Sequence, residues 1–473
     1  MPSALALRLY AASPVWAQNQ ICTWAGARLQ RQRYGPEFER WSIRFAESAR
    51  WSEARLLEYQ LEQLRELIRE CHESVPFYAE RWGAAGLTPE ALGGLQDLAM
   101  FPVTTKDDVF EASTRMISTR FDRKDLVHIT TGGTTGTPLD LYKTRGELQR
   151  HYAAIWSRLR PGVKRGDYYA TFQGKEVVPE HQSRPPYWRE NRAGHQRLYS
   201  MRHLTPAKLE SYAQSLVETP FVYYQGYANF LALIADYMDA HGLTPRTPPV
   251  AIFSTSDQLG AEARTLMERT WKTRVWDDYG QAEFASLIHE CEHRRRHVVM
   301  DYGITEFEPL GHEDGLLVAQ MICTGFVSHA QPLFRYRVGD TVLIEEGARC
   351  PCGRPGPVIR AIRGRTSEYI VTPEGGRYPT ITHFVNELRH VKAVQVVQER
   401  AGAITVRVVP TSGFDPSDEA LVEAVFRAHL GPGLEIKVER VAELERLANG
   451  KVLNIINRLP LETSRRLTAS RSD

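Results

Sequence analysis

The sequence predicts an α/β fold with at least two domains. Its 473 residues are more than a single hydrophobic core usually supports. Between residues 120 and 340, short apolar runs alternate with longer helical patterns, which is typical of a sheet covered by helices. After residue 365, strand-like runs surround one helical pattern, which indicates a compact α+β unit of about one hundred residues. We therefore expect a large N-terminal α/β domain followed by a small C-terminal α+β domain.

The first long element is a predicted helix over residues 38–82. Its apolar residues alternate spacings of four and three, which gives one apolar stripe, and Pro76 is expected to end the stripe. The stripe predicts a packed helix without catalytic function, and its members are Leu57, Leu61, Leu64, Ile68 and Cys71.

The central region contains the runs "DLVHIT", "PVAIFS" and "GLLVAQMIC", which predict strands. The segments "PAKLESYAQSLVET" and "YANFLALIADYMDAHG" predict helices between them. In such a sheet, ligands bind beyond the strand ends. The C-terminal unit contains the predicted strands "VQVVQE", "AITVRVVP" and "LEIKVERV", with a helix in "DEALVEAVFRAHLG".

Composition excludes several classes of protein. A formal net charge of +2 gives no electrostatic reason to expect nucleic-acid binding. No apolar run approaches the roughly 20 residues that span a bilayer. The N-terminus resembles a signal peptide only weakly, because Arg8 interrupts its apolar part. Six cysteines in so long a chain do not form a disulfide scaffold, so we expect a cytoplasmic protein in which clustered cysteines bind a metal.

A glycine- and threonine-rich stretch follows the first predicted strand. Its small side chains bury little apolar area, whereas glycine lets main-chain N–H groups approach a ligand and threonine adds hydroxyl donors. A loop of this kind after a strand suits an anion such as a phosphate. No "GxxxxGK[ST]" pattern is present, so it differs from the kinase-type P-loop. The stretch consists of Thr130, Thr131, Gly132, Gly133, Thr134, Thr135 and Gly136.

Five motifs in order resemble those of the adenylate-forming superfamily, which includes acyl-CoA synthetases, peptide-synthetase adenylation domains and luciferases. The loop "TTGGTTGTP" resembles the phosphate-binding "SSGTTGxP" of that superfamily. The others are "DDYGQAE" at 277–283, "FRYRVGD" at 334–340, "IRGRTSEYI" at 362–370 and "NGKVLNII" at 449–456.

The chain is most similar to the branch that contains phenylacetate-CoA ligase and proteins of capsule-biosynthesis loci. This likeness rests on "QLRELIRECHESVPFYAERW", "FPVTTKDDVF", "PPYWREN" and "QRLYSMRHLT". The resemblance implies an adenylation domain over residues 1–364, with the ATP and acid sites, and a mobile lid domain over residues 365–473.

The resemblance also implies roles for single residues. The loop from Thr130 to Gly136 would hold the β- and γ-phosphates of ATP, and Asp340 would accept hydrogen bonds from the ribose hydroxyls. Lys451 would enter the site when the lid closes and supply positive charge in the adenylation transition state. Glu283 would help to hold Mg²⁺.

Other residues of these motifs complete the implied nucleotide site. Asp278, Tyr279 and Gly280 form the start of the "YGxTE"-like motif, and Arg365 matches an arginine that contacts the nucleotide at the domain junction. The sequence also departs from the superfamily pattern. Ala282 replaces the usual Thr or Ser, and Ser367 with Glu368 replaces the paired aspartates of the hinge, where Glu368 is the expected pivot.

Three cysteines and a histidine resemble a metal site of the phenylacetate-CoA ligase branch. Cys291 lies in "HECEHRRRHVVMD", and Cys350 and Cys352 lie in "GARCPCGRPGP". Three thiolates with one imidazole form a closed, structural type of zinc site. The resemblance favours His297 as the fourth ligand, and the competing histidines are His289 and His293. Free thiols are the alternative. The remaining cysteines, Cys22, Cys71 and Cys323, lie in apolar patterns and are expected in the core.

The resemblance implies an enzyme that activates a carboxylic acid of aryl or arylacetic type with ATP and Mg²⁺, releasing pyrophosphate. The acyl group would then pass to coenzyme A, an amine or a carrier-protein thiol. A zinc-stabilised nucleotide-binding protein without turnover is the alternative of another class. The aromatic run "FVYYQGYANF" indicates either core packing or a pocket wall for a ring through Tyr224, Gly226 and Tyr227. Neither the acid nor the acceptor is identified by the sequence.

Overall fold

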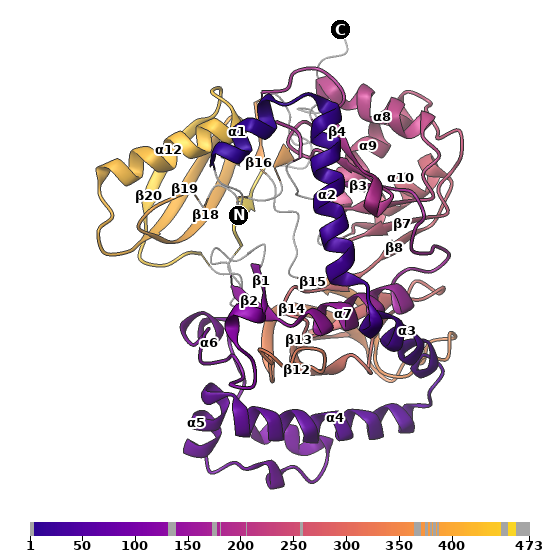
Figure 1. The fold of residues 1–473 in the computed structure, drawn as a ribbon, viewed down its shortest axis with the longest axis vertical. Coiled ribbons are helices and arrows are strands. Elements are labelled where there is room, and N and C mark those ends of the chain that lie inside the picture. Colours follow the sequence, from indigo (N-terminus) through magenta and orange to yellow (C-terminus); the bar gives the residue numbers. More distant parts are fainter. Residues whose placement is uncertain are drawn as a thin grey trace.

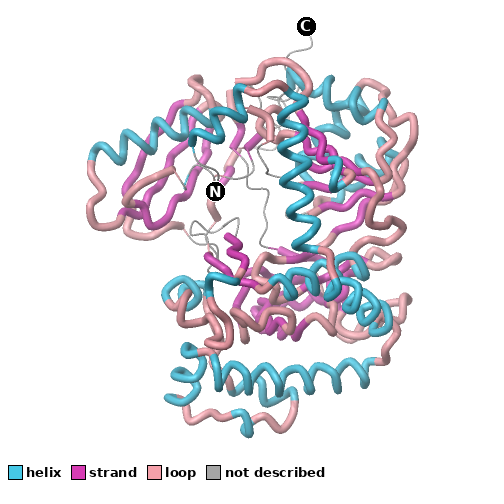
Figure 2. The backbone as a smooth tube through the Cα atoms, viewed as in Figure 1, coloured by secondary structure: helices cyan, strands magenta, loops and turns pink. Residues whose placement is uncertain are grey.

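A computed structural model describes most of the chain. The described residues are 4–130, 139–172, 177–179, 181–204, 206–255, 259–363, 370–373, 377–378, 381, 385, 387–445 and 453–459. Figure 2 shows that the strands gather in separate groups, of which the largest are sheets of six, seven and four strands. Within the described ranges, no helix combines the length and the apolar character needed to cross a membrane.

Helices form the N-terminal part of the structure (Figure 1). The structure corrects the single helix predicted over residues 38–82, because this region contains three helices. Ser52 caps the second of them by accepting a hydrogen bond of 3.3 Å from the Arg55 N–H group. Pro76 begins the third helix, since a first-turn proline loses no helical hydrogen bond. The N-terminal helices are α1 (Ala4–Ala12), α2 (Val15–Arg33), α3 (Pro36–Ser48), α4 (Glu53–Ser74), α5 (Pro76–Ala84) and α6 (Lys106–Glu111).

The apolar stripe of α4 is shifted by one residue at its start. Leu56 is buried, whereas Leu57 is 40% exposed, so the predicted position of Leu57 in the stripe is wrong. Farther along, Leu64, Ile68 and Cys71 are buried as predicted. The buried residues of the first turns of α4 are Leu56, Tyr59 and Gln60, so the buried face of the helix passes beside Leu57.

A mostly parallel sheet of six strands forms the α/β part of the structure, with the order β4-β5-β3-β6-β7-β8. Only β4 runs antiparallel to its neighbour. The helices predicted between the strands are present and pack beside the sheet (Figure 1). The strands are β3 (Tyr169–Phe172), β4 (Trp188–Asn191), β5 (Gln196–Tyr199), β6 (Tyr223–Gly226), β7 (Ala251–Ser254) and β8 (Val275–Asp277), and the helices are α7 (Arg145–Arg158), α8 (Leu209–Glu218), α9 (Ala228–Ala240) and α10 (Ala261–Trp271).

An antiparallel sheet of seven strands follows, with the order β12-β13-β14-β15-β11-β10-β9. The sequence patterns did not separate this sheet from the parallel one, because a buried apolar run does not reveal the direction of its neighbours. The strands are β9 (Tyr279–Gly280), β10 (Leu287–Glu290), β11 (Arg296–Val298), β12 (Gly303–Glu313), β13 (Leu316–Gly325), β14 (Tyr336–Glu345) and β15 (Val358–Arg363). The hairpin of β1 (Val127–Thr130) and β2 (Asp140–Lys143) lies beside this sheet in Figure 1.

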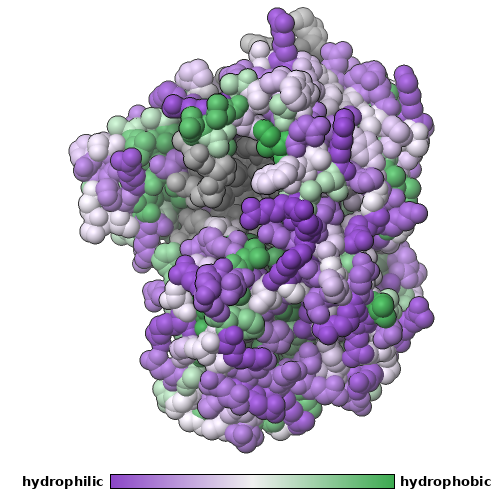
Figure 3. All heavy atoms as spheres, viewed as in Figure 1, coloured by the Kyte–Doolittle hydropathy of each residue, from purple (hydrophilic) through white to green (hydrophobic). Residues whose placement is uncertain are grey.

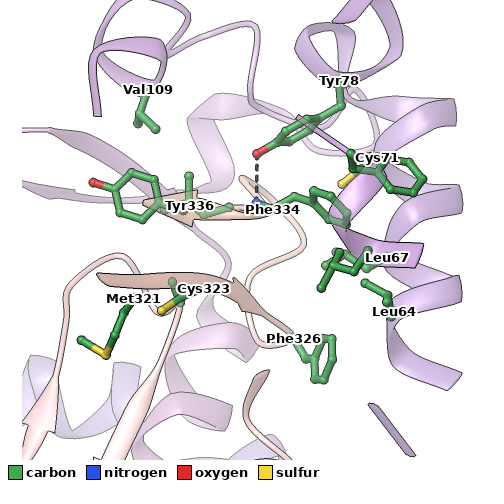
Figure 4. Packing of buried hydrophobic residues seen from close by; sticks show 14 of the residues in the cluster. Leu64, Leu67, Cys71, Tyr78, Val109, Met321, Cys323, Phe326, Phe334 and Tyr336 are labelled. Atoms are coloured by element: carbon green, nitrogen blue, oxygen red, sulfur yellow. Dashed lines mark hydrogen bonds between the residues drawn. The ribbon is translucent and has the colours of Figure 1, made fainter. Parts of the chain in front are cut away.

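The core between α4, α5 and the antiparallel sheet is rich in aromatic residues (Figure 4). Tyr78 is fully buried there. Its hydroxyl accepts a hydrogen bond of 3.0 Å from the Phe334 N–H group and donates one of 3.1 Å to the Pro332 carbonyl. These bonds satisfy a polar group inside an apolar cluster and fix the start of the segment that leads to Asp340.

The C-terminal region forms a separate four-stranded sheet with the order β20-β19-β18-β21. This sheet carries α12 on one side, and together they occupy the upper left of Figure 1. The predicted strands and helix are confirmed as β18 (Val391–Arg400), β19 (Ala403–Pro410), α12 (Pro416–Leu430) and β20 (Glu435–Arg440), and they are joined by β21 (Ile455–Asn457). Short strands β16 (Ile370–Val371) and β17 (Arg377–Tyr378) precede them. The short 3-10 helices of the chain are Pro89–Ala91, Leu95–Met100, Arg123–Asp125, Arg192–Gly194 and Pro206–Lys208.

Candidate active site

The candidate active site begins where the parallel strand β8 ends. The Asp278 N–H group donates a hydrogen bond of 3.2 Å to the Ser254 carbonyl at the end of β7. The next residues form β9 and a turn that ends at Phe284. The motif that the sequence analysis assigned to the nucleotide therefore lies at the carboxyl ends of the parallel strands, where α/β sheets bind ligands.

Asp278 forms a buried ion pair with Arg160, which follows α7. Burial raises the pKa of the Asp278 carboxyl to about 7, and the Arg160 guanidinium opposes this rise. Arg160 also lies 4.5 Å from the centre of the Phe253 ring. The sequence analysis did not single out Arg160, because its contact with Asp278 depends on how α7 packs against the sheet.

Asp340 approaches the same motif from the antiparallel sheet. The Tyr279 hydroxyl donates a hydrogen bond of 2.8 Å to Asp340 Oδ2, and both residues are buried. Opposite β13, the register of β14 shifts between Arg337 and Thr341, so Asp340 lies in a bulge. Gly339 in this bulge has a φ of 80°, a conformation that glycine adopts readily. Bulges of this kind redirect a side chain, and here the redirected residue is Asp340.

Glu283 lies near the end of the turn, and the buried side chain of Lys143 contacts its main chain. Lys143 Nζ donates hydrogen bonds of 3.3 Å to the Glu283 carbonyl and of 2.6 Å to Ser328 Oγ. Burial lowers the pKa of Lys143 to about 8, and the nearby carboxylates of Glu147 and Glu283 oppose that change. Lys143 was missed at the sequence level. A single lysine at the end of a strand gives no signal that it is buried.

The residue after Glu283 is held in an unusual conformation. Phe284 has a φ of 61°, which is costly for an aromatic residue. Its ring stacks on His151 with 3.8 Å between ring centres and an interplanar angle of 12°. This packing holds the main chain directly after Glu283 and so fixes the position from which the Glu283 side chain extends.

Several predicted site residues lie outside the described residues. For the phosphate loop, the structure describes only Thr130, which pairs with Asp140 at the end of the β1–β2 hairpin. The predicted residues outside the described ranges are Thr131, Gly132, Gly133, Thr134, Thr135, Gly136, Arg365, Ser367, Glu368 and Lys451.

A cavity of about 520 Å³ lies against the turn of the motif. It is lined by Asp278, Gly280 and the two residues that follow Gly280, and by Arg160. Ala282, the departure from the superfamily pattern, therefore faces the cavity with a methyl group instead of a hydroxyl. The other lining residues are mostly apolar and come from α2, β1 and α7: Leu29, Gln32, Arg33, Val127, His128, Ile129, Leu148, His151, Tyr152, Ile155 and Leu159, together with Gln225, Thr255, Phe284 and Leu287.

The structure does not place the three aromatic-run residues in the lining of this cavity. Tyr224 is fully buried in the core, with its ring 5.2 Å from that of Trp271, which agrees with core packing, one of the two interpretations of the aromatic run. Gly226 ends β6 beside Phe172, and Tyr227 follows as the N-cap of α9. A Cβ at Gly226 would lie 2.5 Å from the Phe172 carbonyl oxygen. Gln225 is the residue of this strand that reaches the cavity, because neighbouring strand residues face opposite sides.

A second candidate site is a cluster of three thiols and one imidazole. The ligand atoms of Cys291, His297, Cys350 and Cys352 all lie within 4.8 Å of one another. Cys291 directly follows β10 and His297 lies in β11, and the two other cysteines lie in the connection between β14 and β15. His289 instead directs Nδ1 toward the Arg158 carbonyl, 3.2 Å away, and His293 is exposed. Of the competing histidines, only His297 is in the cluster.

The distances between ligand atoms in this cluster suit an ion with tetrahedral coordination. Zinc bonds of about 2.3 Å to sulfur and about 2.0 Å to nitrogen separate two sulfurs by about 3.8 Å and a sulfur and a nitrogen by about 3.5 Å in a tetrahedron. The observed distances are 3.6 Å between the sulfurs of Cys291 and Cys350, and 3.4 Å between Cys352 Sγ and His297 Nε2. Burial lowers the pKa of His297 to about 4, so the imidazole is neutral at pH 7, the form that binds metals.

The comparisons with known proteins agree with this arrangement. Residues 370–458 match the family described as the CapK C-terminal domain. Over 461 residues, the chain is 24% identical to Protein CapK of Staphylococcus aureus, covering 95% of this chain and 99% of that protein. It is also 24% identical to the phenylacetate-coenzyme A ligase of Thermus thermophilus, covering 78% and 86% of the two chains.

A solved structure supports the fold. The crystal structure of 2-hydroxyisobutyryl-CoA ligase in complex with 2-HIB-AMP and CoA aligns with a TM-score of 0.56 at 19% identity, covering 89% of this chain and 93% of that one. The chain therefore shares the fold of this CoA ligase. Its sequence is similar to CapK and to the phenylacetate-CoA ligases, which confirms the resemblance found in the sequence.

Proposed function

We propose that this protein is an AMP-forming ligase that activates a carboxylic acid with ATP and transfers the acyl group to coenzyme A. The observation that carries the proposal is the cavity beside Asp278 and Gly280, with the linked Tyr279 and Asp340 behind the same turn. A nucleotide motif therefore lies next to a space large enough for a small organic ligand. The phenylacetate-CoA ligase relatives support both half-reactions.

In the first half-reaction, a carboxylate oxygen attacks the α-phosphorus of ATP. The bond from that phosphorus to the bridging oxygen breaks, and pyrophosphate leaves with the electron pair. Asp340 is assigned to the ribose hydroxyls, because the Tyr279 hydroxyl orients its carboxylate, and a carboxylate accepts hydrogen bonds from hydroxyl groups. Loop residues 130–136 are assigned to the β- and γ-phosphates, Arg365 to the nucleotide, and Lys451 to the transition-state charge.

Glu283 is the residue assigned to Mg²⁺. Its carboxylate is a hard oxygen ligand, and Lys143 and the packed Phe284 ring fix the backbone that carries it. When bound, Mg²⁺ would offset the charge of the phosphates. A zinc ion is assigned to the cluster of Cys291, His297, Cys350 and Cys352, where four protein ligands leave no open position, so its role is structural.

In the second half-reaction, the thiol of coenzyme A attacks the acyl carbon and AMP leaves. Coenzyme A is the proposed acceptor because the phenylacetate ligase relatives are named for it. An amine or a carrier-protein thiol remains the alternative acceptor. Incubation of the enzyme with acid, ATP and either coenzyme A or hydroxylamine distinguishes these cases, since a coenzyme A enzyme forms thioester faster than it forms hydroxamate.

The proposed compartment is the cytoplasm. All six cysteines are described, and all are free thiols in the structure, as expected for a chain that folds under reducing conditions. Cys22, Cys71 and Cys323 are buried, as the sequence predicted.

The experiment that tests the proposal is exchange of labelled pyrophosphate into ATP, measured with a panel of aryl, arylacetic and alkyl acids. We expect exchange that requires an acid, and we expect Lys451→Ala to lower its rate by about 10²- to 10³-fold, the loss of one transition-state charge contact. Nucleotide binding without exchange for every acid would instead support a zinc-stabilised binding protein without turnover.

A further inference from the structure

A second cavity continues the cavity of the active site. It has a volume of about 630 Å³, and we call it the outer chamber, and the cavity of about 520 Å³ the inner chamber. The two chambers share the lining residues Leu29, Gln32, Val127 and His128. The shared residues show that the two chambers adjoin each other. Figure 3 shows the same face of the molecule as Figure 1, with polar and apolar side chains mixed on it.

Helix α2 forms one wall of the outer chamber. Trp24, Arg28 and Gln32 repeat every four residues, as do Ala25 and Leu29, so these side chains share one face of the helix. The opposite face is fixed to the parallel sheet, where the Glu190 N–H group donates a hydrogen bond of 2.9 Å to Asn19 Oδ1. The wall therefore does not need a ligand to hold it in place.

Strand β1 and the residue before it form the facing wall. Leu126, Val127 and His128 line the outer chamber. His128 is held by Asp140 Oδ1 at 2.6 Å from Nε2, and its ring stacks on Tyr142 with 5.2 Å between ring centres. Both walls are thus fixed by contacts on their outer sides, and the space between them is set by the fold.

The lining of the outer chamber is chiefly apolar. Trp24 is 66% exposed, although an indole is usually at least partly buried, and it lies at the outer end of the space. Arg28 is the single lysine or arginine among the described lining residues. A polyphosphate acceptor such as coenzyme A would need several cations, so these walls suit an apolar or aromatic group instead.

We propose that the outer chamber binds the distal, apolar part of the carboxylic acid, so that the substrate is an extended acid whose body passes from the inner chamber along α2 to Trp24. The inference rests on the proposed function, because the carboxylate must lie beside the nucleotide motif. The nucleotide and the reacting carboxylate share the inner chamber. An acid much longer than phenylacetate therefore has to continue through the outer one.

The test uses a series of ω-phenylalkanoic acids with two to ten carbons in the acid chain. In pyrophosphate exchange without coenzyme A, kcat/KM should rise about 2- to 4-fold for each added methylene until the chain reaches Trp24, the gain expected for a buried methylene. Ala25→Trp fills the outer chamber from an exposed helix position. It should lower kcat/KM for the longest bound acid at least 10-fold more than it does for phenylacetate. Trp16→Ala removes an exposed tryptophan of the same helix that lines neither chamber, and it should leave the length dependence unchanged.

Equilibrium binding of the same acids by calorimetry in the absence of ATP separates this inference from the proposed function. In one outcome, binding depends on acid length, Ala25→Trp removes that dependence, and no acid supports exchange. This outcome would support acid binding in the outer chamber and refute the proposed ligase activity. Exchange with phenylacetate but no gain with length would overturn the extended substrate. An effect of Ala25→Trp on the KM of coenzyme A alone would also overturn it, because the outer chamber would then serve the acceptor.

Discussion

Tyr279 and Asp340 join two segments that are distant in sequence through one buried hydrogen bond of 2.8 Å. The tyrosine belongs to the strand that follows the parallel sheet, and the aspartate belongs to a bulge of the antiparallel sheet. The contact fixes the orientation of the carboxylate that we propose for the two ribose hydroxyls. It also makes the position of one motif depend on the other.

Tyr279→Phe removes the hydroxyl and keeps the ring. We expect the affinity for ATP to fall about 5- to 30-fold, because a hydrogen bond to a charged group contributes about 1 to 2 kcal/mol and Asp340 would lose its fixed orientation. Calorimetric titration with ATP measures the change. Tyr237→Phe on the surface of α9 is the matched control. An unchanged ATP affinity in Tyr279→Phe would show that ATP binding does not depend on the orientation that the Tyr279 hydroxyl gives to Asp340.

Lys143 supports the turn that ends at Glu283. Lys143→Met keeps the length and apolar stem of the side chain but removes the hydrogen bonds to the Glu283 carbonyl and to Ser328. We expect adenylation to slow by about 10- to 100-fold and to need more Mg²⁺, because a displacement of about 1 Å at a reacting group has an effect of this size. The free energy of unfolding should also decrease, because the Glu283 carbonyl and Ser328 lose a buried hydrogen-bond donor.

The control for Lys143→Met is Lys124→Met, which changes an exposed lysine shortly before β1. Exchange rates measured over a range of Mg²⁺ concentrations distinguish the two variants. A Lys143→Met enzyme with normal magnesium dependence would show that Lys143 serves only the core.

Burial raises the pKa of Asp278, and the Arg160 guanidinium lowers it. The folded pKa is raised from the ordinary value of 3.8 to about 7, so between these pH values the folded state binds more protons than the unfolded state. The free energy of unfolding should therefore decrease as pH rises from about 4 to about 7, and this contribution should be constant above that range.

Urea denaturation of the wild type and of Asp278→Asn from pH 5 to pH 8 measures this contribution. The asparagine does not titrate, so the stability of the wild type relative to the variant should decrease as pH rises from 5 to about 7 and then level off. A relative stability that increases with pH would mean that Arg160 outweighs burial and lowers the pKa.

The sequence predicted the elements of this fold better than their relationships. The C-terminal strands and helix were predicted from period and β-branched content, and the structure confirms them. The break before Glu53 was missed, because one apolar stripe can pass through two helices that meet end to end. The antiparallel sheet was not distinguished, since strand direction depends on connections rather than on local composition.

The same limit applies to the candidate site. Cys291, Cys350 and Cys352 could be grouped in advance only through the resemblance to the phenylacetate-CoA ligase branch, because the spacing of Cys350 and Cys352 alone also fits free thiols. Lys143 and Arg160 could not be found, because their importance comes from burial beside carboxylates that are distant in sequence. The sequence also gave no indication of the outer chamber, because α2 forms a wall of that chamber only when it packs on the sheet.

The last prediction concerns the cluster of Cys291, His297, Cys350 and Cys352. Protein purified without chelator should carry close to one zinc per chain by elemental analysis, because a closed site with three thiolates binds tightly. Cys352→Ser should lower both zinc content and the melting temperature, since metal-binding energy contributes to folding. ATP affinity of the folded fraction should be nearly unchanged, because the cluster is separate from the residues that line the nucleotide cavity.

Two matched variants test the composition of this site. Cys323→Ala removes another buried thiol and should leave zinc content unchanged even where it lowers the melting temperature. His297→Ala should lower zinc content, whereas His289→Ala should not, because His289 Nδ1 faces the Arg158 carbonyl instead of the thiols. Loss of exchange activity in Cys352→Ser at unchanged stability would indicate a catalytic metal. Wild-type protein without zinc would show that the cluster consists of ordinary thiols.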